Sequence, residues 1–292
     1  MTGAPPRLDA ADAEHLAFSL GGEVAFLRAT QGVFFARREV WPPLSPVFRL
    51  LRGIYELEPQ RAHFIVRNRT FSTAPVSSSC FGAARVAGHR LSGSVRAADH
   101  GRAELAALPR IDAGAAAPFA RPAAIDPALA AVVAAARVRA DDDAGWMALA
   151  VRLARAVEHE AESLPPDARR DNPIAALLVD PAAGLLAWAT NTGSLNVTSH
   201  AEVNLVERWL ARARRPLPRG SRLYSTLKPC KMCAGLVWDA AEEPRDLLVF
   251  YAEDDPLRYA RETVLDAGSM ARRRVARDAE DLARVLQRHL PA

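Results

Sequence analysis

The chain has 292 residues, half of them hydrophobic and a quarter charged, a composition that excludes wholesale disorder and predicts two domains. No apolar stretch approaches the ~18 residues of a membrane-spanning helix, so we expect no membrane partner. Three cysteines are too few for a disulfide framework, and the first residues lack the basic and then apolar pattern of a secretory signal. We therefore expect a cytoplasmic protein.

The net charge of +4 is unevenly distributed along the chain. Residues 1–140 hold 17 arginines and 11 acidic residues, whereas residues 141–292 hold 21 basic and 23 acidic residues. The front half is therefore basic (+6) and the back half slightly acidic (−2). A basic half is typical of a protein that binds a polyanion, but also of a solvated arginine-rich surface, and the charge alone leaves both interpretations open.

The first 100 residues predict a mixture of strands and helices. Short apolar runs bounded by turn residues predict strands at 16–20, 24–29, 33–36 and 62–71. Gly21-Gly22 predicts a hairpin between the first two runs, and apolar residues at helical spacing predict a helix over 45–57. We interpret residues 1–100 as a smaller α+β domain, with binding of a nucleic acid or a partner as its candidate role.

Residues 101–126 are rich in alanine, glycine and proline and poor in large apolar residues, so we expect a linker there. Beyond it, Asp126-Pro127 opens a predicted helix to about residue 139, followed by an amphipathic helix from residue 143. The later elements are expected as a hairpin over 174–189, helices at 199–214, 231–240, 256–265 and 278–290, and strands at 222–227 and 247–251. This alternation predicts an α/β domain over residues 127–292.

Two short motifs carry the chemistry. Ser199-His200-Ala201-Glu202 opens one predicted helix, and Pro229-Cys230-Lys231-Met232-Cys233 opens another. Cysteines three residues apart at a helix N-terminus project toward one point, where the helix dipole favours thiolate. His200 can complete a set of three ligands, which leaves the fourth position of zinc for water and lowers the pKa of that water toward ~7. We therefore expect one zinc ion per chain, held by His200, Cys230 and Cys233 with a bound water or hydroxide.

Glu202 lies too close to His200 at a helix start to be a fourth ligand, so we predict that it is the catalytic acid and base. Together the motifs match the His-x-Glu and Pro-Cys-x-x-Cys signature of zinc-dependent deaminases. A Cys-x-x-Cys pair alone would also fit a redox pair or a structural zinc site. A four-cysteine site is excluded because Cys80 is the only other cysteine, and a redox pair has no use for the His-x-Glu motif.

From about residue 143 to 270 the chain resembles the cytidine deaminase-like superfamily of zinc hydrolases. The phrase Pro-Cys-Lys-Met-Cys-Ala-Gly is particularly similar to its tRNA adenosine deaminase branch. The resemblance implies a three-layer α/β/α sandwich around a five-stranded mixed sheet, and the metal-binding and acid–base roles assigned above. It also implies substrate contacts at Asn191, Ala201 and Pro229, although Asn191 fits a turn equally well.

The same resemblance bears on partners and on departures from the family. The basic run 272–274 falls where the tRNA branch touches nucleic acid, although a solvated helix face is the simpler interpretation. A homodimer is the assembly that the superfamily favours. Lys228 and Lys231 depart from the branch pattern, and two cations beside the cysteines favour thiolate. The front 140 residues have no counterpart in the small bacterial tRNA enzyme, but bacterial nucleic-acid deaminases with an added N-terminal domain carry a similar phrase.

We therefore predict a zinc-dependent hydrolytic deaminase of adenine or cytosine in single-stranded or flipped-out nucleic acid, with RNA preferred over single-stranded DNA. The basic front half would then hold the phosphate backbone. A free nucleobase, nucleoside or nucleotide is the alternative substrate. A non-catalytic, zinc-containing scaffold subunit is the second alternative, and the presence of Glu202 argues against it.

Overall fold

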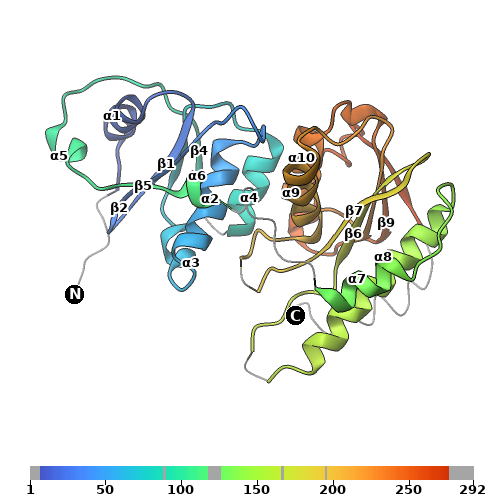
Figure 1. Cartoon of the computed structure of the whole chain (residues 1–292). Helices are drawn as coiled ribbons and strands as arrows, with labels where there is room; N and C mark the ends of the chain where they lie inside the picture. Colours follow the sequence, from blue (N-terminus) through green and yellow to red (C-terminus); the bar gives the residue numbers. More distant parts are fainter. Residues whose placement is uncertain (1–6, 88–89, 118–125, 166–167, 195, 276–292) are drawn as a thin grey trace. The chain divides into compact units, whose positions relative to one another are not determined.

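The computed structural model describes residues 7–87, 90–117, 126–165, 168–194 and 196–275, in two units that span Met1–Pro118 and Phe119–Ala292. Each unit has a five-stranded sheet and its own hydrophobic core (Figure 1). Among the described residues, no helix combines the length and the apolar character that crossing a lipid bilayer requires.

The first unit is built around a sheet in the order β4-β3-β1-β2-β5. Its strands are β1 (Val24–Ala29), β2 (Gly32–Arg37), β3 (Thr70–Ser72), β4 (Leu91–Ser94) and β5 (Arg110–Asp112). Its helices are α1 (Ala10–Leu20), α2 (Pro46–Leu57), α3 (Ala62–Ile65), α4 (Ser78–Ala87), α5 (Ala103–Ala106) and α6 (Ala113–Ala116). The antiparallel β1–β2 hairpin is central, and its Phe26 and Phe35 pack in one core with Leu16 of α1.

Two predicted strands of this unit are wrong. Residues 16–20 belong to α1, because the carboxylate of Asp9 caps its first turn and the apolar residues continue the buried face of a helix. The hairpin with 24–29 is instead made by β2. Residues 62–65 form a helical turn, and within the expected strand over 62–71 only the end, in β3, is extended. The helix expected over 45–57 is confirmed as α2.

The alanine- and glycine-rich stretch before residue 118 differs from the expected linker. Residues 103–116 form α5, β5 and α6, and β5 pairs in parallel with β2. Helix α6 lies so close to α2 that a Cβ atom at Gly53 would be 1.7 Å from the carbonyl oxygen of Ala113. Small residues are present because backbones meet here, which explains why the composition suggested a linker. The remaining part, residues 118–125, lies outside the described residues.

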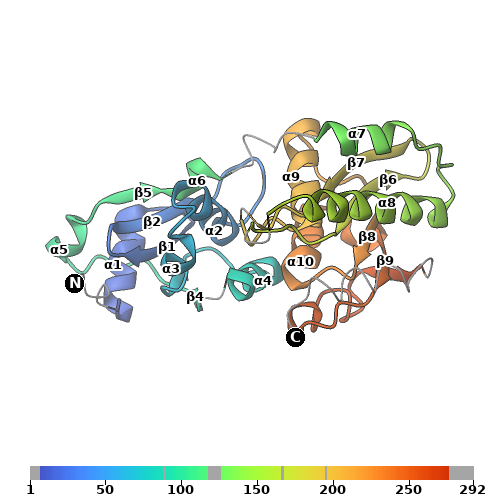
Figure 2. The same cartoon turned by 90° about the horizontal axis from the view of Figure 1, so that it is seen from below.

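The second unit has a mixed sheet in the order β10-β9-β8-β6-β7. Its strands are β6 (Ala175–Asp180), β7 (Gly184–Thr190), β8 (Arg222–Leu227), β9 (Leu248–Glu253) and β10 (Ala271–Arg274). Its helices are α7 (Pro127–Ala134), α8 (Asp143–Glu162), α9 (Ala201–Ala213) and α10 (Lys231–Ala240). Helix α8 covers one face of the sheet, and α9 and α10 cover the other (Figures 1 and 2). This confirms the predicted three-layer α/β/α sandwich.

Sequence patterns explain how α8 packs. The carboxylate of Asp142 accepts a hydrogen bond from the backbone N–H of Gly145 (2.8 Å) and caps the first turn. Apolar residues at helical spacing then place Leu149 and Leu153 in the core with Tyr224 of β8. The apolar face of α8 thus packs against one face of the sheet and leaves the other face to α9 and α10.

The C-terminal part of this unit corrects two further predictions. The helix expected over 256–265 is only a short 3-10 turn, η3 (Arg258–Ala260), because side-chain hydrogen bonds around Thr263 compete with a helical backbone. The basic run 272–274 lies in β10, which pairs in parallel with β9, and not on a helix face. The helix expected over 278–290 lies outside the described residues.

The contact between α2 and α6 can be tested by adding one methyl group. Gly53→Ala should lower the free energy of unfolding of the first unit by about 1–3 kcal/mol, because the new Cβ atom overlaps the Ala113 carbonyl and the two helices must separate. Thermal and urea unfolding measure the change. Gly93→Ala, where no atom lies within 4 Å of the added Cβ, is the matched control. Equal stability of the two variants would contradict the close packing of α6.

Candidate active site

Three side chains converge where α9 and α10 begin. His200 is the N-cap residue of α9, Cys230 is the N-cap residue of α10, and Cys233 lies in the first turn of α10. The Nδ1 atom of His200 lies 3.6 Å from Sγ of Cys230 and 3.5 Å from Sγ of Cys233, and the two sulfurs are 3.4 Å apart. These atoms form the group suited to a metal ion among the described residues.

The donor set fits tetrahedral zinc. Zinc–sulfur bonds of ~2.3 Å and zinc–nitrogen bonds of ~2.0–2.1 Å place tetrahedral donor atoms about 3.5–3.8 Å apart. The observed separations of 3.4–3.6 Å agree with this geometry to within a few tenths of an ångström. Two thiolates and one imidazole are also the ligand types that zinc prefers, and three of them leave a position open for substrate chemistry.

The loop before α9 is held by one side chain that the sequence motifs do not include. The amide of Asn204 donates hydrogen bonds to the backbone carbonyls of Thr190 (2.8 Å) and Ser199 (3.2 Å) and to Oγ1 of Thr192 (2.9 Å). Because Thr190 ends β7 and Ser199 precedes His200, these hydrogen bonds from Asn204 hold the turn before His200 against the end of β7. Asn204 lies one helical turn after His200, which is the only sequence signal for this role.

Glu202 is buried on the site side of α9. Its carboxylate is only 3% exposed, and Oε1 accepts a hydrogen bond from the hydroxyl of Ser225 in β8 (2.7 Å). Burial raises the pKa of Glu202, and the negative charge of Cys230 raises it further. A carboxyl group with a raised pKa exchanges protons more readily near neutral pH, as an acid–base catalyst must. Ser225 was not predicted, and its signal is a polar residue in an otherwise buried apolar strand.

The two cysteines differ in acidity. The hydrogen bond with Cys233 and the neighbouring His200 hold the pKa of Cys230 well below its usual value. Burial, together with the adjacent Cys230, raises the pKa of Cys233. Cys230 is therefore the more acidic thiol of the pair, and binding of a metal cation would favour the deprotonated form of both.

The three residues expected to contact substrate are all buried: Asn191, Ala201 and Pro229. Ala201 and Pro229 each adjoin a ligand, His200 and Cys230 respectively. The side chain of Asn191 forms a turn, because its Oδ1 atom accepts a hydrogen bond from the backbone N–H of Gly193 (2.7 Å). The structure thus shows the turn role of Asn191, and the three substrate contacts stay predictions.

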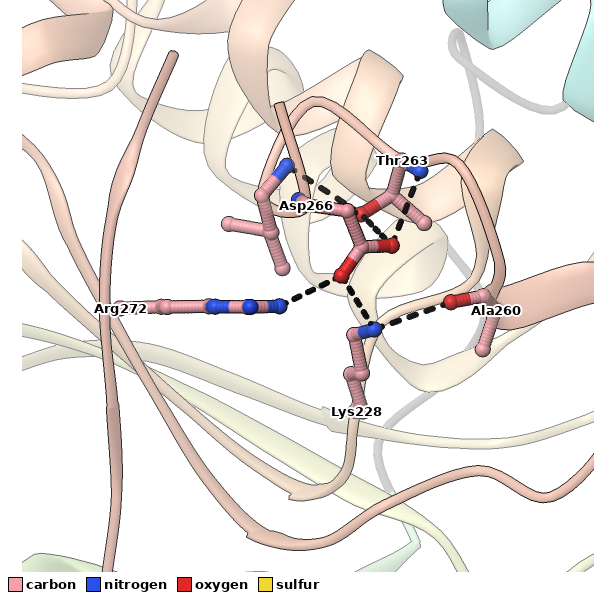
Figure 3. Close-up of polar contacts among 6 residues, drawn as sticks. Lys228, Ala260, Thr263, Asp266 and Arg272 are labelled. Atoms are coloured by element: carbon pink, nitrogen blue, oxygen red, sulfur yellow. Dashed lines mark hydrogen bonds and ion pairs between the residues drawn. The ribbon is translucent and has the colours of Figure 1, made fainter. Parts of the chain in front are cut away.

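Lys228 holds the loop that leads into Cys230. Its ammonium group donates to the carbonyl of Ala260 (3.1 Å) and to Oδ1 of Asp266 (2.7 Å). The same carboxylate oxygen accepts a hydrogen bond from Arg272 of β10 (2.6 Å), while Oδ2 accepts from the backbone N–H and hydroxyl of Thr263. Figure 3 shows Lys228 and Arg272 converging on Asp266. This node ties the ligand loop, the segment after β9 and the edge strand together.

The structure shows which carboxylates lie beside the two lysines. We expected the charges of Lys228 and Lys231 to favour thiolate at the cysteines. The structure pairs Lys228 with Asp266 and brings Lys231 to 4.0 Å from the carboxylate of Glu262. Lys228 is therefore held by a carboxylate, and the hydrogen bond with Cys233 and the neighbouring His200 lower the pKa of Cys230.

Part of the chain is similar to known deaminases. Residues 166–276 match the family model of the Bd3614-like deaminases. This segment is similar to that family over less than half of the chain, and it contains His200, Cys230 and Cys233. A tRNA-specific adenosine deaminase of Haemophilus influenzae is 32% identical over 105 residues, which are 35% of this chain and 56% of that protein. The chain thus matches about half the length of that relative.

Solved structures similar to this chain include one from a study of A-to-I editing by tRNA deaminases at the wobble position of transfer RNA. It is 28% identical, covers 48% of this chain and 97% of its own, and superposes with a TM-score of 0.37. Another was determined in complex with 2,6-diaminopurine, is 20% identical, covers 57% of this chain and 90% of its own, and has a TM-score of 0.42.

Metal analysis tests whether His200, Cys230 and Cys233 bind zinc. We expect the purified chain to contain one zinc ion, and Cys233→Ser to reduce the zinc content to a trace, because a hydroxyl is a poor replacement for thiolate in a three-ligand site. Cys80→Ser is the matched control, since Cys80 lies in the first unit and contacts Ser45. Full zinc occupancy of Cys233→Ser would contradict the assigned ligands.

The Asp266 node predicts a pH dependence of stability. Burial favours protonation of Asp266, but hydrogen bonds from Lys228, Thr263 and Arg272 outweigh it and hold its pKa far below the usual value. A lowered pKa stabilises the fold above the unfolded-state pKa of about 3.9, and this stabilisation is lost as the pH falls. Wild type should therefore unfold at higher urea concentration than Asp266→Asn at pH 7, with the difference shrinking below about pH 4. A difference independent of pH would contradict the charged node.

Proposed function

We propose that the second unit is a zinc-dependent hydrolytic deaminase. Its substrate is an adenine or cytosine base in a single-stranded or flipped-out nucleic acid, and we favour RNA over single-stranded DNA as that nucleic acid. The observation that carries the proposal is the set of three zinc-compatible donor atoms together with the buried residue Glu202, which lies two residues after His200. A redox pair would not need that carboxylate, and a closed structural site would need a fourth protein ligand.

The residues of the site have three different roles in the proposed reaction. A zinc ion held by His200, Cys230 and Cys233 supplies Lewis-acid activation of water at neutral pH. Glu202 would take a proton from the attacking water and deliver it to the ring nitrogen beside the amine-bearing carbon. It would then take the proton of the newly added hydroxyl, which becomes a carbonyl, and pass it to the amino group, which leaves as ammonia. Ser225 holds the carboxylate of Glu202 by its hydrogen bond, so that the same oxygen faces the reacting centre throughout.

The polymer substrate rests on two supporting facts. The curated relative is named as a tRNA-specific adenosine deaminase, and it is 32% identical to this chain over 105 residues. Residues 1–140 carry 17 arginines against 11 acidic residues, a surplus suited to a phosphate backbone, whereas the rest of the chain is slightly acidic. A homodimer and a cytoplasmic location stay predictions of the sequence.

The chemistry can be tested with a conservative variant. Wild type should release ammonia from total RNA or single-stranded DNA, and Glu202→Gln should lower the rate by about 10²–10⁴-fold, because the amide cannot shuttle protons. Mass spectrometry of the digested nucleic acid identifies the product base. Zinc content and unfolding midpoint of Glu202→Gln should equal those of wild type, which separates catalysis from metal binding.

The alternatives have distinct outcomes in the same assay. Ammonia from free nucleobases, nucleosides or nucleotides but not from polymers would replace the polymer with a small substrate. Zinc-loaded wild type that releases no ammonia from any of these pools would contradict an enzyme and favour the scaffold subunit. Equal ammonia release by wild type and Glu202→Gln would overturn the role of the carboxylate.

A further inference from the structure

A hollow outside the metal site lies along the open edge of β7. It has a volume of about 200 Å³ and is lined by residues from α7, β7 and α9: Val133, Leu185, Leu186, Ala187, Trp188, Arg208, Trp209 and Arg212. β7 pairs only with β6 in this sheet, so its other edge faces the hollow. The metal ligands are absent from this lining, and the proposed reaction makes no use of it.

Arg208 carries a charge that the described residues do not compensate. Its guanidinium donates a hydrogen bond to the carbonyl oxygen of Trp188 and lies over the indole ring, 5.2 Å from the ring centre. Burial lowers the pKa of Arg208. Within the described ranges no carboxylate forms an ion pair with Arg208 or with Arg212, and a half-buried cation without a counter-ion destabilises a protein.

The spacing of these arginines adds to the cost. Arg208 and Arg212 lie one helical turn apart on α9, an arrangement in which like charges repel by a few tenths of a kcal/mol. Arg215, just beyond the end of α9, places its guanidinium 5.4 Å from the ring centre of Trp209. Two arginines and two tryptophans thus line the hollow, and of the two indoles Trp209 is buried whereas Trp188 is partly exposed.

A partly exposed indole beside an exposed arginine is typical of sites that bind single-stranded nucleic acid, where bases stack on rings and phosphates meet arginines, and Trp188 and Arg212 supply this pair. The hollow is smaller than the ~300–1,000 Å³ of sites that enclose drug-sized ligands, so it suits one ring system with its phosphate outside. Addition of a strand from another protein is disfavoured, because Arg208 already occupies the carbonyl of Trp188 on the strand edge.

We propose that the β7-edge hollow binds one base of a single-stranded nucleic acid, with the adjoining phosphate held by Arg208 and Arg212. This deepens the proposed function, on which it rests for the presence of a strand. His200 and Arg208 are eight residues apart along α9, or about 12 Å along the helix axis. The hollow would therefore hold a nucleotide a few positions away from the base that is deaminated.

The test is binding of a fluorescently labelled oligoribonucleotide to the full chain, followed by anisotropy. Arg212→Glu should raise Kd at least about tenfold and reduce the steepness of the salt dependence, since each phosphate contact with a single strand contributes a slope of about 0.7. Arg139→Glu is the matched control, because Arg139 is exposed in the same unit and makes the same charge change. Trp188→Phe should reduce the quenching of tryptophan fluorescence that the oligoribonucleotide causes.

Each outcome decides one claim. Equal Kd values for Arg212→Glu and Arg139→Glu, or quenching unchanged in Trp188→Phe, would overturn the hollow as a binding site even where deamination is found. A selective loss of binding in Arg212→Glu supports the hollow, even if wild type releases no ammonia and the proposed reaction fails. A change of oligomeric state in Arg212→Glu, with Kd unaltered, would identify the edge as a protein interface and contradict the proposal.

Discussion

Two helices of the second unit begin at one point, and their first residues supply all three metal-compatible donors. Cys230 caps α10 directly after β8, and His200 caps α9 after the loop that follows β7. The partial positive charge of both helix starts favours the thiolate that the site requires. A shift of either helix by a fraction of a turn would separate the donors beyond the reach of a single ion. The packing of α9 against α10 is therefore the constraint on which the site depends.

Residues from several strands and loops hold the donor side chains and Glu202 in place. Asn204 fastens the turn before His200 to the end of β7, and Ser225 of β8 orients Glu202. Lys228 ties the loop before Cys230 to Asp266 in the segment after β9. These contacts reach the site from strands and loops distant in sequence, so the position of each donor is set by the sheet as well as by its own helix. Such support keeps catalytic groups within the narrow tolerance that chemistry requires.

Sequence reasoning predicted the second unit well because its signals are local. Apolar periodicity marked α8, and the two motifs predicted the starts of α9 and α10 and the three side chains that the structure brings together there. It failed where tertiary contacts decide. The arginines of β10 have no strand signature, and only pairing with β9 makes them a strand. The small residues of α6 suggested a linker because their reason, the close approach to Gly53, is a contact made across the fold. Asn204 and Ser225 were missed since a single polar residue shows no partner until the chain folds.

The central claim is a mononuclear zinc centre with three protein ligands and one open position. X-ray absorption at the zinc edge measures it directly on the purified chain. The zinc should have two sulfur neighbours at about 2.3 Å, one imidazole nitrogen at about 2.0–2.1 Å and one further light atom that is not from the protein. Four protein-derived neighbours, or a shell without two sulfurs, would contradict it.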